Sequence, residues 1–251
     1  MGPDSAPWLD IGWSCIDGHI FINRDGTPYV FFARVRVIGK PWKRPSEGYI
    51  YGMIYGGALT ADLTALAGEP ILCLQADQPW EEPASMHTRC NEGPFVLRRG
   101  GTYYMTYSAN HYANPDYGIG YATAPSPLGP WTKSPDNPLA AKDIARGISG
   151  PGHNSITVSP DGRELLLVYH THADPDRPSG DRTVNVDRLV FDEQGRLRLI
   201  GPTRSPNPCP RGRPSDHPRR PASACRRPHP LLYLPIFLMF LRHSSTHLIG
   251  E

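Results

Sequence analysis

Short apolar segments separated by tight-turn residues recur along residues 14–201. Three stretches share one pattern, in which an ionisable residue opens an apolar segment and a turn glycine follows nine positions later. The three stretches are 17–26, 92–101 and 153–162. Asp-Gly and Gly-Gly turns of this kind close β-hairpins. The returning strands are expected at 29–32, 103–107 and 165–169.

Further strand-forming segments follow each hairpin. They are expected at 49–55 and 58–63, at 117–123 and 129–131, and at 183–191 and 196–200. About four short strands per unit is the composition of a propeller blade. A sandwich and a stacked β-solenoid are the alternatives. The propeller is favoured because only a radial array brings equivalent strand starts to one axis. Three recognisable blades are fewer than the ~4 of the smallest propellers, so we expect an incomplete all-β propeller.

Composition supports a β protein and excludes several classes. The 29 prolines and 25 glycines break the chain into short segments and disfavour long helices. A net charge of +2, without a basic stripe, predicts no nucleic-acid partner. The five cysteines form no CxxC pair, so a zinc site is not expected. The first residues lack the basic and apolar regions of a signal peptide, which leaves localisation open.

The chain changes character near Ser205. Residues 205–227 are rich in proline and arginine and are expected to be disordered. The apolar run at 231–241 is shorter than the ~20 residues of a membrane span, and Pro235 interrupts it. Non-native sequence is therefore preferred over a C-terminal anchor. The predicted organisation is an N-terminal remnant at 1–13, a partial propeller domain at 14–204 and a tail at 205–251.

The ionisable residues of the three units are Asp17, Glu92 and His153. Equivalent register predicts that they meet in space. A glutamate that is partly desolvated beside another carboxylate has a raised pKa, as a general acid requires. Asp17 would then be a fixed charge that keeps Glu92 protonated. Taken singly, each has an ordinary alternative: a strand-start glutamate, a turn aspartate or a core histidine.

Several other residues are candidates for sugar binding. His153 could bind a sugar hydroxyl or hold a hydrated cation, although no EF-hand-like spacing supports a dedicated calcium site. Trp80 is a loop aromatic that could stack on a sugar ring. Asn110 lies beside the second hairpin and could recognise hydroxyls. Arg182 precedes the late strand of the third unit and could reach the pocket.

Short motifs in a fixed order resemble glycoside hydrolase family 43, the five-bladed β-propeller arabinanases, arabinofuranosidases and β-xylosidases. The resemblance covers about residues 15–203. The matching stretches are 16–29, 91–95 with 101–108, 118–123 with 126–131, and 150–155 with 168–172.

The resemblance implies a role for each clustered residue. Asp17 is the pKa modulator, Glu92 the general acid, and His153 the central histidine associated with a cation or water cluster. The family inverts configuration by acid and base catalysis. The resemblance implies no required cofactor, a structural Ca²⁺ as a candidate near His153, and plant cell-wall oligo- or polysaccharides as partners.

The general base of the family comes from a blade upstream of the Asp17 unit. Asp4 and Asp10 are the only acids there, and neither lies in a hairpin of the repeat form. We therefore expect the first blade and the end of the last to be absent or altered.

The leading hypothesis is an inverting hydrolase of arabinose- or xylose-containing polysaccharides. The second is an inactive fragment or carbohydrate-binding propeller that lacks the base. An unrelated interaction propeller is the third, and the acids in repeat register weigh against it. An extracellular location suits a polymeric substrate.

Overall fold

The computed structural model describes residues 10–39, 48–82 and 88–204. The expected tail at 205–251 and most of the expected N-terminal remnant lie outside the described residues. Within the described residues, no helix has the length and apolar character needed to cross a membrane.

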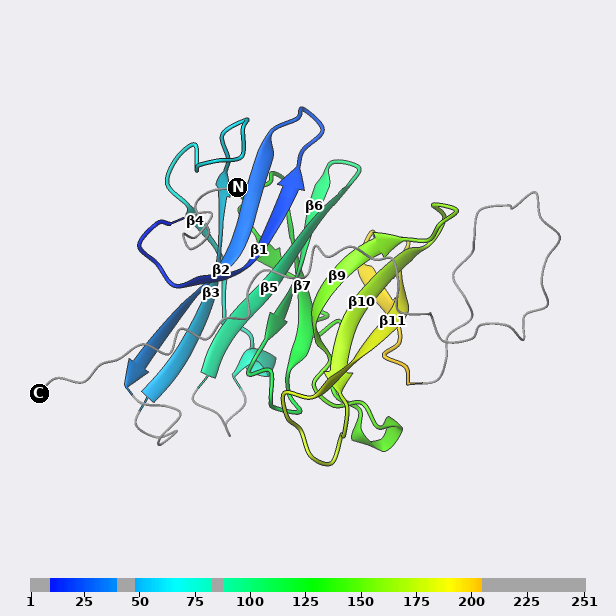
Figure 1. Ribbon diagram of the computed structural model, residues 1–251. Helices are drawn as coiled ribbons and strands as arrows, with labels where there is room; N and C mark the ends of the chain where they lie inside the picture. Colours follow the sequence, from blue (N-terminus) through cyan, green and yellow to red (C-terminus); the bar gives the residue numbers. More distant parts are fainter. Residues whose placement is uncertain (1–9, 40–47, 83–87, 205–251) are drawn as a thin grey trace, which may run out of the picture. The chain divides into compact units, whose positions relative to one another are not determined.

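The described residues form three consecutive four-stranded antiparallel units (Figure 1). The first contains β1 (Cys15–Ile22), β2 (Pro28–Gly39), β3 (Gly48–Ala58) and β4 (Ile71–Gln75). The second contains β5 (Thr88–Arg99), β6 (Thr102–Ala109), β7 (Gly118–Ala124) and β8 (Thr132–Lys133). The third contains β9 (Gly152–Val158), β10 (Leu165–His172), β11 (Arg182–Phe191) and β12 (Leu197–Ile200). Two single-turn 3₁₀ helices, η2 (Pro79–Glu81) and η3 (Ile144–Arg146), are also described.

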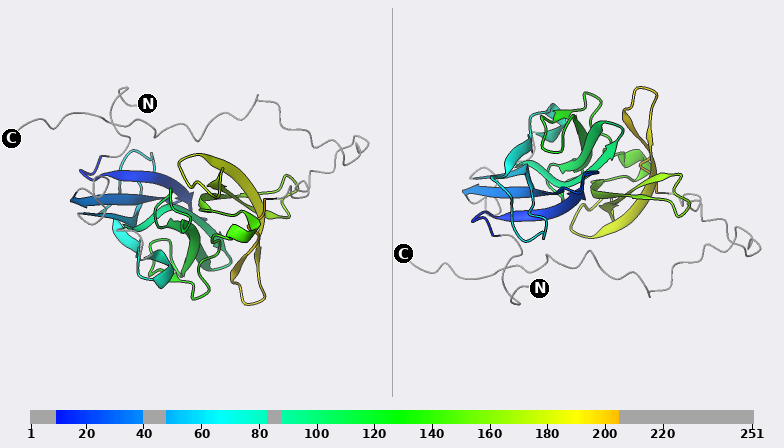
Figure 2. Two further views of the ribbon diagram at one scale, coloured as in Figure 1. Left: turned by 90° about the horizontal axis from the view of Figure 1, so that it is seen from below. Right: turned by 90° about the horizontal axis from the view of Figure 1, so that it is seen from above.

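The first strand of each unit lies beside its counterparts. A short parallel pairing, Ile50–Gly52 of β3 with Thr88–Cys90 of β5, joins the first two units into one sheet. The third unit is a separate four-stranded sheet. Strand β5 contacts both β1 and β9. Figure 2 shows the three described units side by side without closure into a ring. The all-β, incomplete propeller-type fold and the three hairpins are confirmed.

One strand was misplaced in the sequence analysis. Residues 58–63 do not form a strand, because β3 ends at Ala58 and a turn follows. Asp62 Oδ1 accepts hydrogen bonds from the hydroxyls of Thr60 and Thr64, and these bonds stabilise the turn. Such local side-chain bonds compete with sheet pairing. The fourth strand of this unit is β4, which pairs with β3.

A second expected strand is displaced. The segment at 129–131 precedes the two-residue strand β8 rather than forming a strand itself. The order of elements in the second unit is unchanged by this shift.

The second unit is buried on both faces. One face packs against the first unit through Phe31, Ile54, Val96 and Met105. The opposite face packs against the third unit in a second cluster. That cluster contains Tyr104, Ile119, Tyr121, Leu167, Tyr169 and Leu189. This explains why β6 is buried at seven consecutive positions after Thr102, instead of alternating as a half-exposed strand does.

His19 of β1 helps to join the first two units. Its Nε2 lies 3.3 Å from the Val96 carbonyl oxygen, and its ring centroid is 4.3 Å from that of Phe95. Burial lowers the pKa of His19 to about 4, whereas its hydrogen bond to Val96 acts in the opposite direction. The neutral imidazole is therefore the form that fits between the units.

This pKa shift predicts acid sensitivity. A folded-state pKa below the ordinary 6.5 means that the stabilisation is present above pH 6.5 and is lost as pH falls toward about 4. His19→Gln keeps an N–H for Val96 but cannot be protonated. Between pH 7 and pH 5, denaturant titration should show that this variant loses about 2 kcal/mol less stability than the unmodified chain. Equal losses in both proteins would contradict the assignment.

Candidate active site

The structure brings Asp17, Glu92 and His153 together. They come from the first strands β1, β5 and β9, and one potential ligand atom from each lies within 4.8 Å of the others. Each is partly buried; the side chains of Asp17 and His153 are 16% and 34% exposed. The cluster therefore has restricted access to solvent but remains reachable.

The backbone is irregular at this point in all three strands. In β1 the sheet register shifts between Ile16 and His19, and in β5 it shifts between Glu92 and Phe95. In the β9–β10 pair it shifts between Val168 and His170 of β10, opposite the 152–155 segment of β9. Asp17 and His153 have φ values of 60° and 51°, and Gly93 has a φ of 57°. A left-handed conformation costs a non-glycine residue about 1–2 kcal/mol. Bulges of this kind re-aim side chains, so the repeat preserves a backbone geometry as well as an ionisable residue.

Hydrogen bonds fix both carboxylates. Asp17 Oδ2 accepts the Gly93 backbone N–H at 3.1 Å, and Asp17 Oδ1 lies 3.8 Å from His153 Nε2. Glu92 Oε1 accepts the Tyr117 hydroxyl at 2.6 Å. The thiol of Cys90 lies 3.6 Å from Glu92 Oε2.

Burial is the largest cause of the raised pKa values of Asp17 and Glu92. Burial, and then the Asp17 charge, raise the pKa of Glu92, against the opposing effects of Tyr117 and His153. Burial likewise raises the pKa of Asp17, while His153 and the Gly93 N–H act to lower it. Glu92 therefore holds its proton to higher pH than an ordinary glutamate, as a general acid must.

Trp80 and Asn110 do not contact the cluster through any described interaction. The Trp80 indole donates to Gln78 Oε1 at 2.8 Å, and its ring lies 6.2 Å from that of Tyr107. Asn110 is 1% exposed, and its amide donates to the backbone oxygens of Trp80 and Asp116. Both amide hydrogens are thus used within the protein, and we assign neither residue to sugar binding.

Arg182 lies at the exposed start of β11. It is connected to the cluster through the rings of His170 and Tyr117. Its Nη1 is 3.3 Å from His170 Nε2, and its guanidinium is 5.5 Å from the Tyr112 ring. The His170 ring stacks on Tyr117 at 5.6 Å, and Tyr117 touches Glu92. This arrangement is compatible with sugar contact by Arg182, which stays a prediction.

Sequence analysis placed Tyr117 only at the start of the strand expected at 117–123 and missed its contact with Glu92. The signal for it lies in Gly152. A Cβ at Gly152 would come within 2.0 Å of the Tyr117 ring. That glycine occupies a motif position without an evident turn requirement.

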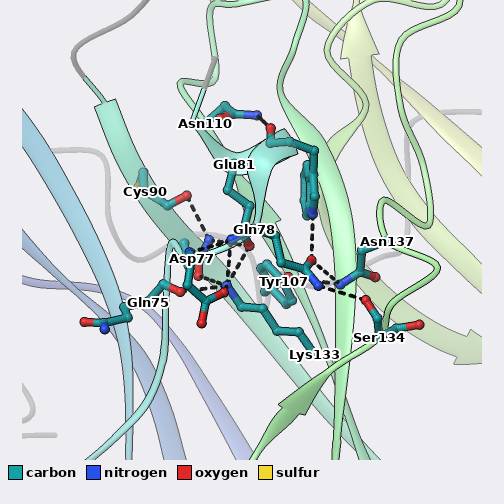
Figure 3. A network of polar contacts seen from close by, with 12 residues as sticks. Gln75, Asp77, Gln78, Glu81, Cys90, Tyr107, Asn110, Lys133, Ser134 and Asn137 are labelled. Atoms are coloured by element: carbon teal, nitrogen blue, oxygen red, sulfur yellow. Dashed lines mark hydrogen bonds and ion pairs between the residues drawn. The ribbon is translucent and has the colours of Figure 1, made fainter. Parts of the chain in front are cut away.

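A buried polar network supports the strand that carries Glu92 (Figure 3). Lys133 Nζ lies 2.7 Å from both carboxylate oxygens of Glu81 and 3.0 Å from Asn91 Oδ1. The Asn91 amide in turn donates to Glu81 Oε1 at 3.1 Å. The Lys133 and Glu81 side chains are 6% and 0% exposed. Because Asn91 directly precedes Glu92, this network holds η2, β8 and the start of β5 together.

Asp10 does not serve as the missing base in the described geometry. It is exposed, and its Oδ1 accepts the Gly12 N–H at 2.9 Å. Asp4 lies outside the described residues. We assign no general base.

An all-β propeller-type fold with two partly buried carboxylates where its first strands meet is compatible with a glycosidase, and comparison with known proteins gives the family. The chain belongs to the glycosyl hydrolases family 43, whose sequence model matches residues 3–197.

Similar proteins support this membership. A crystal structure of a thermostable family-43 glycoside hydrolase is 52% identical, with a TM-score of 0.73, and the match covers 82% of this chain and 64% of that one. An endo-1,4-β-xylanase of Bacteroides thetaiotaomicron is 34% identical, with a TM-score of 0.63 and coverage of 76% and 60%. An extracellular exo-α-(1→5)-L-arabinofuranosidase of Streptomyces avermitilis is 39% identical over 67% of this chain and 34% of its own length.

A β-D-galactofuranosidase of Aspergillus niger is 31% identical over 76% of this chain and 47% of its own length. The chain thus spans between about a third and two thirds of the length of these relatives.

Removal of the charge of Asp17 should stabilise the folded chain. Asp17→Asn keeps an acceptor for the Gly93 N–H and tolerates the left-handed backbone, but removes a desolvated charge beside Glu92. Since the folded-state pKa values of both carboxyls are raised, their ionisation destabilises the folded state as pH rises. The gain should be on the order of 1 kcal/mol at pH 7 and should fade at acidic pH.

Denaturant titrations of the Asp17→Asn variant at pH 7 and pH 4 measure this difference. Asp25→Asn is the control, because Asp25 lies in an exposed turn where bonds to Thr27 lower its pKa. A loss of stability in Asp17→Asn at pH 7 would refute the repulsion argument.

The buried ion pair predicts a large stability effect. Lys133→Met leaves the Glu81 carboxylate buried without its cation, which should cost about 3–5 kcal/mol. Lys142→Met is the matched control: its partner is Asp116 at 2.6 Å, but the side chains are 45% and 31% exposed. That change should cost less than about 1 kcal/mol. Urea unfolding measures the loss of stability in both variants. Similar losses would contradict the stabilising role of the buried Lys133–Glu81 pair.

Proposed function

We propose that this chain performs acid-catalysed cleavage of glycosidic bonds, with Glu92 as general acid and Asp17 as its pKa modulator. The carrying observation is the buried Glu92 carboxyl, whose pKa is raised by burial and by Asp17 at the meeting point of three first strands. Family membership agrees with this chemistry. We propose that residues 14–204 form the partial propeller domain that carries this activity, as inferred from the sequence.

The reaction begins with proton transfer. Glu92 gives its proton to the glycosidic oxygen while the bond from that oxygen to the anomeric carbon breaks. Water adds at the anomeric carbon and loses its proton to a base. Inverting enzymes hold their two carboxyls about 6.5–9.5 Å apart to leave room for this water. The carboxylates of Asp17 and Glu92 approach within 4.8 Å, too close for such a pair. Asp17 therefore suits the role of modulator, and the base is a separate group.

The substrate class follows from chemistry shared among relatives. The similar proteins are named for arabinofuranosidase, galactofuranosidase and xylanase activities. We propose arabinose- or xylose-containing plant polysaccharides as substrates. Arg182 and His153 are the proposed sugar contacts, since Arg182 is exposed and the His153 side chain is 34% exposed. An extracellular location is proposed because one relative is named as extracellular and polymers do not enter cells.

The side chains of the cluster can be compared with the ligands that the candidate Ca²⁺ would need. Calcium takes six to eight oxygen ligands at about 2.3–2.6 Å. The cluster offers two carboxylates and one imidazole, and Tyr117 and Gly93 already donate to one oxygen of each carboxylate. These residues do not fit a directly coordinated Ca²⁺. Our proposal is limited to a hydrated cation held through water near His153, and hydrolysis needs no cofactor.

A second candidate function is carbohydrate binding without turnover, because we assign no general base. A chain of this kind would keep the sugar contacts and the acid but would activate water poorly.

The Glu92→Gln variant separates these functions. Gln keeps the shape of the side chain but has no proton to give, so hydrolysis of arabino- and xylo-oligosaccharides should fall by about 10²–10⁴-fold. Reducing-sugar release measures turnover, and calorimetry measures binding. Thr60→Ala, in an exposed turn of the first unit, is the control and should retain full activity. Oligosaccharide binding without turnover by the unmodified chain would favour the second candidate.

A further inference from the structure

Tyr117 is the residue whose hydroxyl touches the Glu92 carboxyl. It lies directly before β7, is 0% exposed and donates to Glu92 Oε1 at 2.6 Å. Burial, and then the Glu92 charge, raise the pKa of the Tyr117 phenol well above its ordinary value. The phenol is therefore a permanent donor, and Oε1 is a permanent acceptor.

Ser108 lies beside this contact. Its hydroxyl oxygen accepts the His153 backbone N–H at 2.7 Å. Ser108 acts to lower the pKa of the Tyr117 phenol, against the larger effects of burial and of Glu92. Ser108 is also 0% exposed, so water does not compete for these groups.

The Tyr117 ring is held in place from several sides. It stacks on His170 at 5.6 Å with planes 13° apart. Gly152 leaves the space that it occupies, since a Cβ there would lie 2.0 Å from the ring. The Tyr117 backbone N–H donates to Asn114 at 3.0 Å. A phenol confined in this way can determine the orientation of the carboxyl that it contacts.

We propose that Tyr117 is a positioning residue that selects which oxygen of Glu92 carries the transferable proton. A neutral carboxyl has one O–H and one carbonyl oxygen. Oε1 accepts from Tyr117 and is held as the carbonyl oxygen, so Oε2 carries the proton. The thiol of Cys90, 3.6 Å from Oε2, is a weaker donor and does not reverse this preference. Asp17 and His153 are the other charged or titratable groups of the cluster. The role in proton delivery rests on the proposed function, whereas the oxygen assignment does not.

The oxygen assignment is tested without turnover. Infrared spectra of protein with ¹³C-labelled glutamate carboxyls are recorded at mildly acidic pH, and the Glu92 band is identified by its loss in Glu92→Gln. Loss of the donor in Tyr117→Phe should move the Glu92 carbonyl band to higher frequency. Tyr107→Phe is the control, because Tyr107 is equally buried but its hydroxyl oxygen accepts a hydrogen bond from the Asn137 amide and does not contact Glu92. An unshifted band in Tyr117→Phe would overturn the proposal.

Leaving-group dependence tests the role in catalysis. Dinitrophenolate is a good leaving group and departs from a dinitrophenyl glycoside without being protonated. The sugar leaving group of a disaccharide needs a proton from the general acid. Tyr117→Phe should lower kcat for disaccharides by roughly tenfold, the scale of one hydrogen bond to a charged group, with little change for dinitrophenyl glycosides and in KM. Equal losses for both substrates would reject positioning of the acid. If the unmodified chain hydrolyses neither substrate, the proposed function fails and the infrared shift alone decides the oxygen assignment.

Discussion

The site depends on the burial of the second unit on both of its faces. Packing of apolar side chains against the first unit on one side and the third on the other brings β1 and β9 into contact with β5. Without both interfaces, Asp17 and His153 would not reach Glu92. The hydrophobic effect thus provides the force that holds two desolvated carboxylates together, an arrangement that electrostatics alone opposes.

Much of the fold could be predicted because its signal is local. Turn glycines and period-two apolar segments define the hairpins, and both depend on residues close in sequence. The failures have local causes as well. The segment at 58–63 contains enough apolar residues for a strand, but the hydroxyls of Thr60 and Thr64 bind Asp62 and close a turn. Side-chain capping of this kind is weakly visible in a hydrophobic pattern.

The ionisable members of the site could be predicted, but their supporting residues could not. Asp17, Glu92 and His153 share a register, and register carries over from sequence to space in a repeat. Asn110 and Trp80 lie outside the strands, where residues have no register. The Asn110 amide binds backbone oxygens of Trp80 and Asp116, and the Trp80 indole donates to the Gln78 side chain. The partnership of Lys133 with Glu81 joins positions 52 residues apart in different elements. No periodicity reveals such a pair, because only the packed sheets bring the two together.

Gly152 shows that functional constraint can fall on a residue without functional groups. Its missing side chain is the space in which the Tyr117 ring lies, and the ring in turn holds the Glu92 carboxyl. A mutational survey restricted to polar or charged neighbours of Glu92 would omit this position. Even alanine at 152 would displace the Tyr117 ring from Glu92. Under the proposed function, such a variant would lose activity while every reacting group was still present.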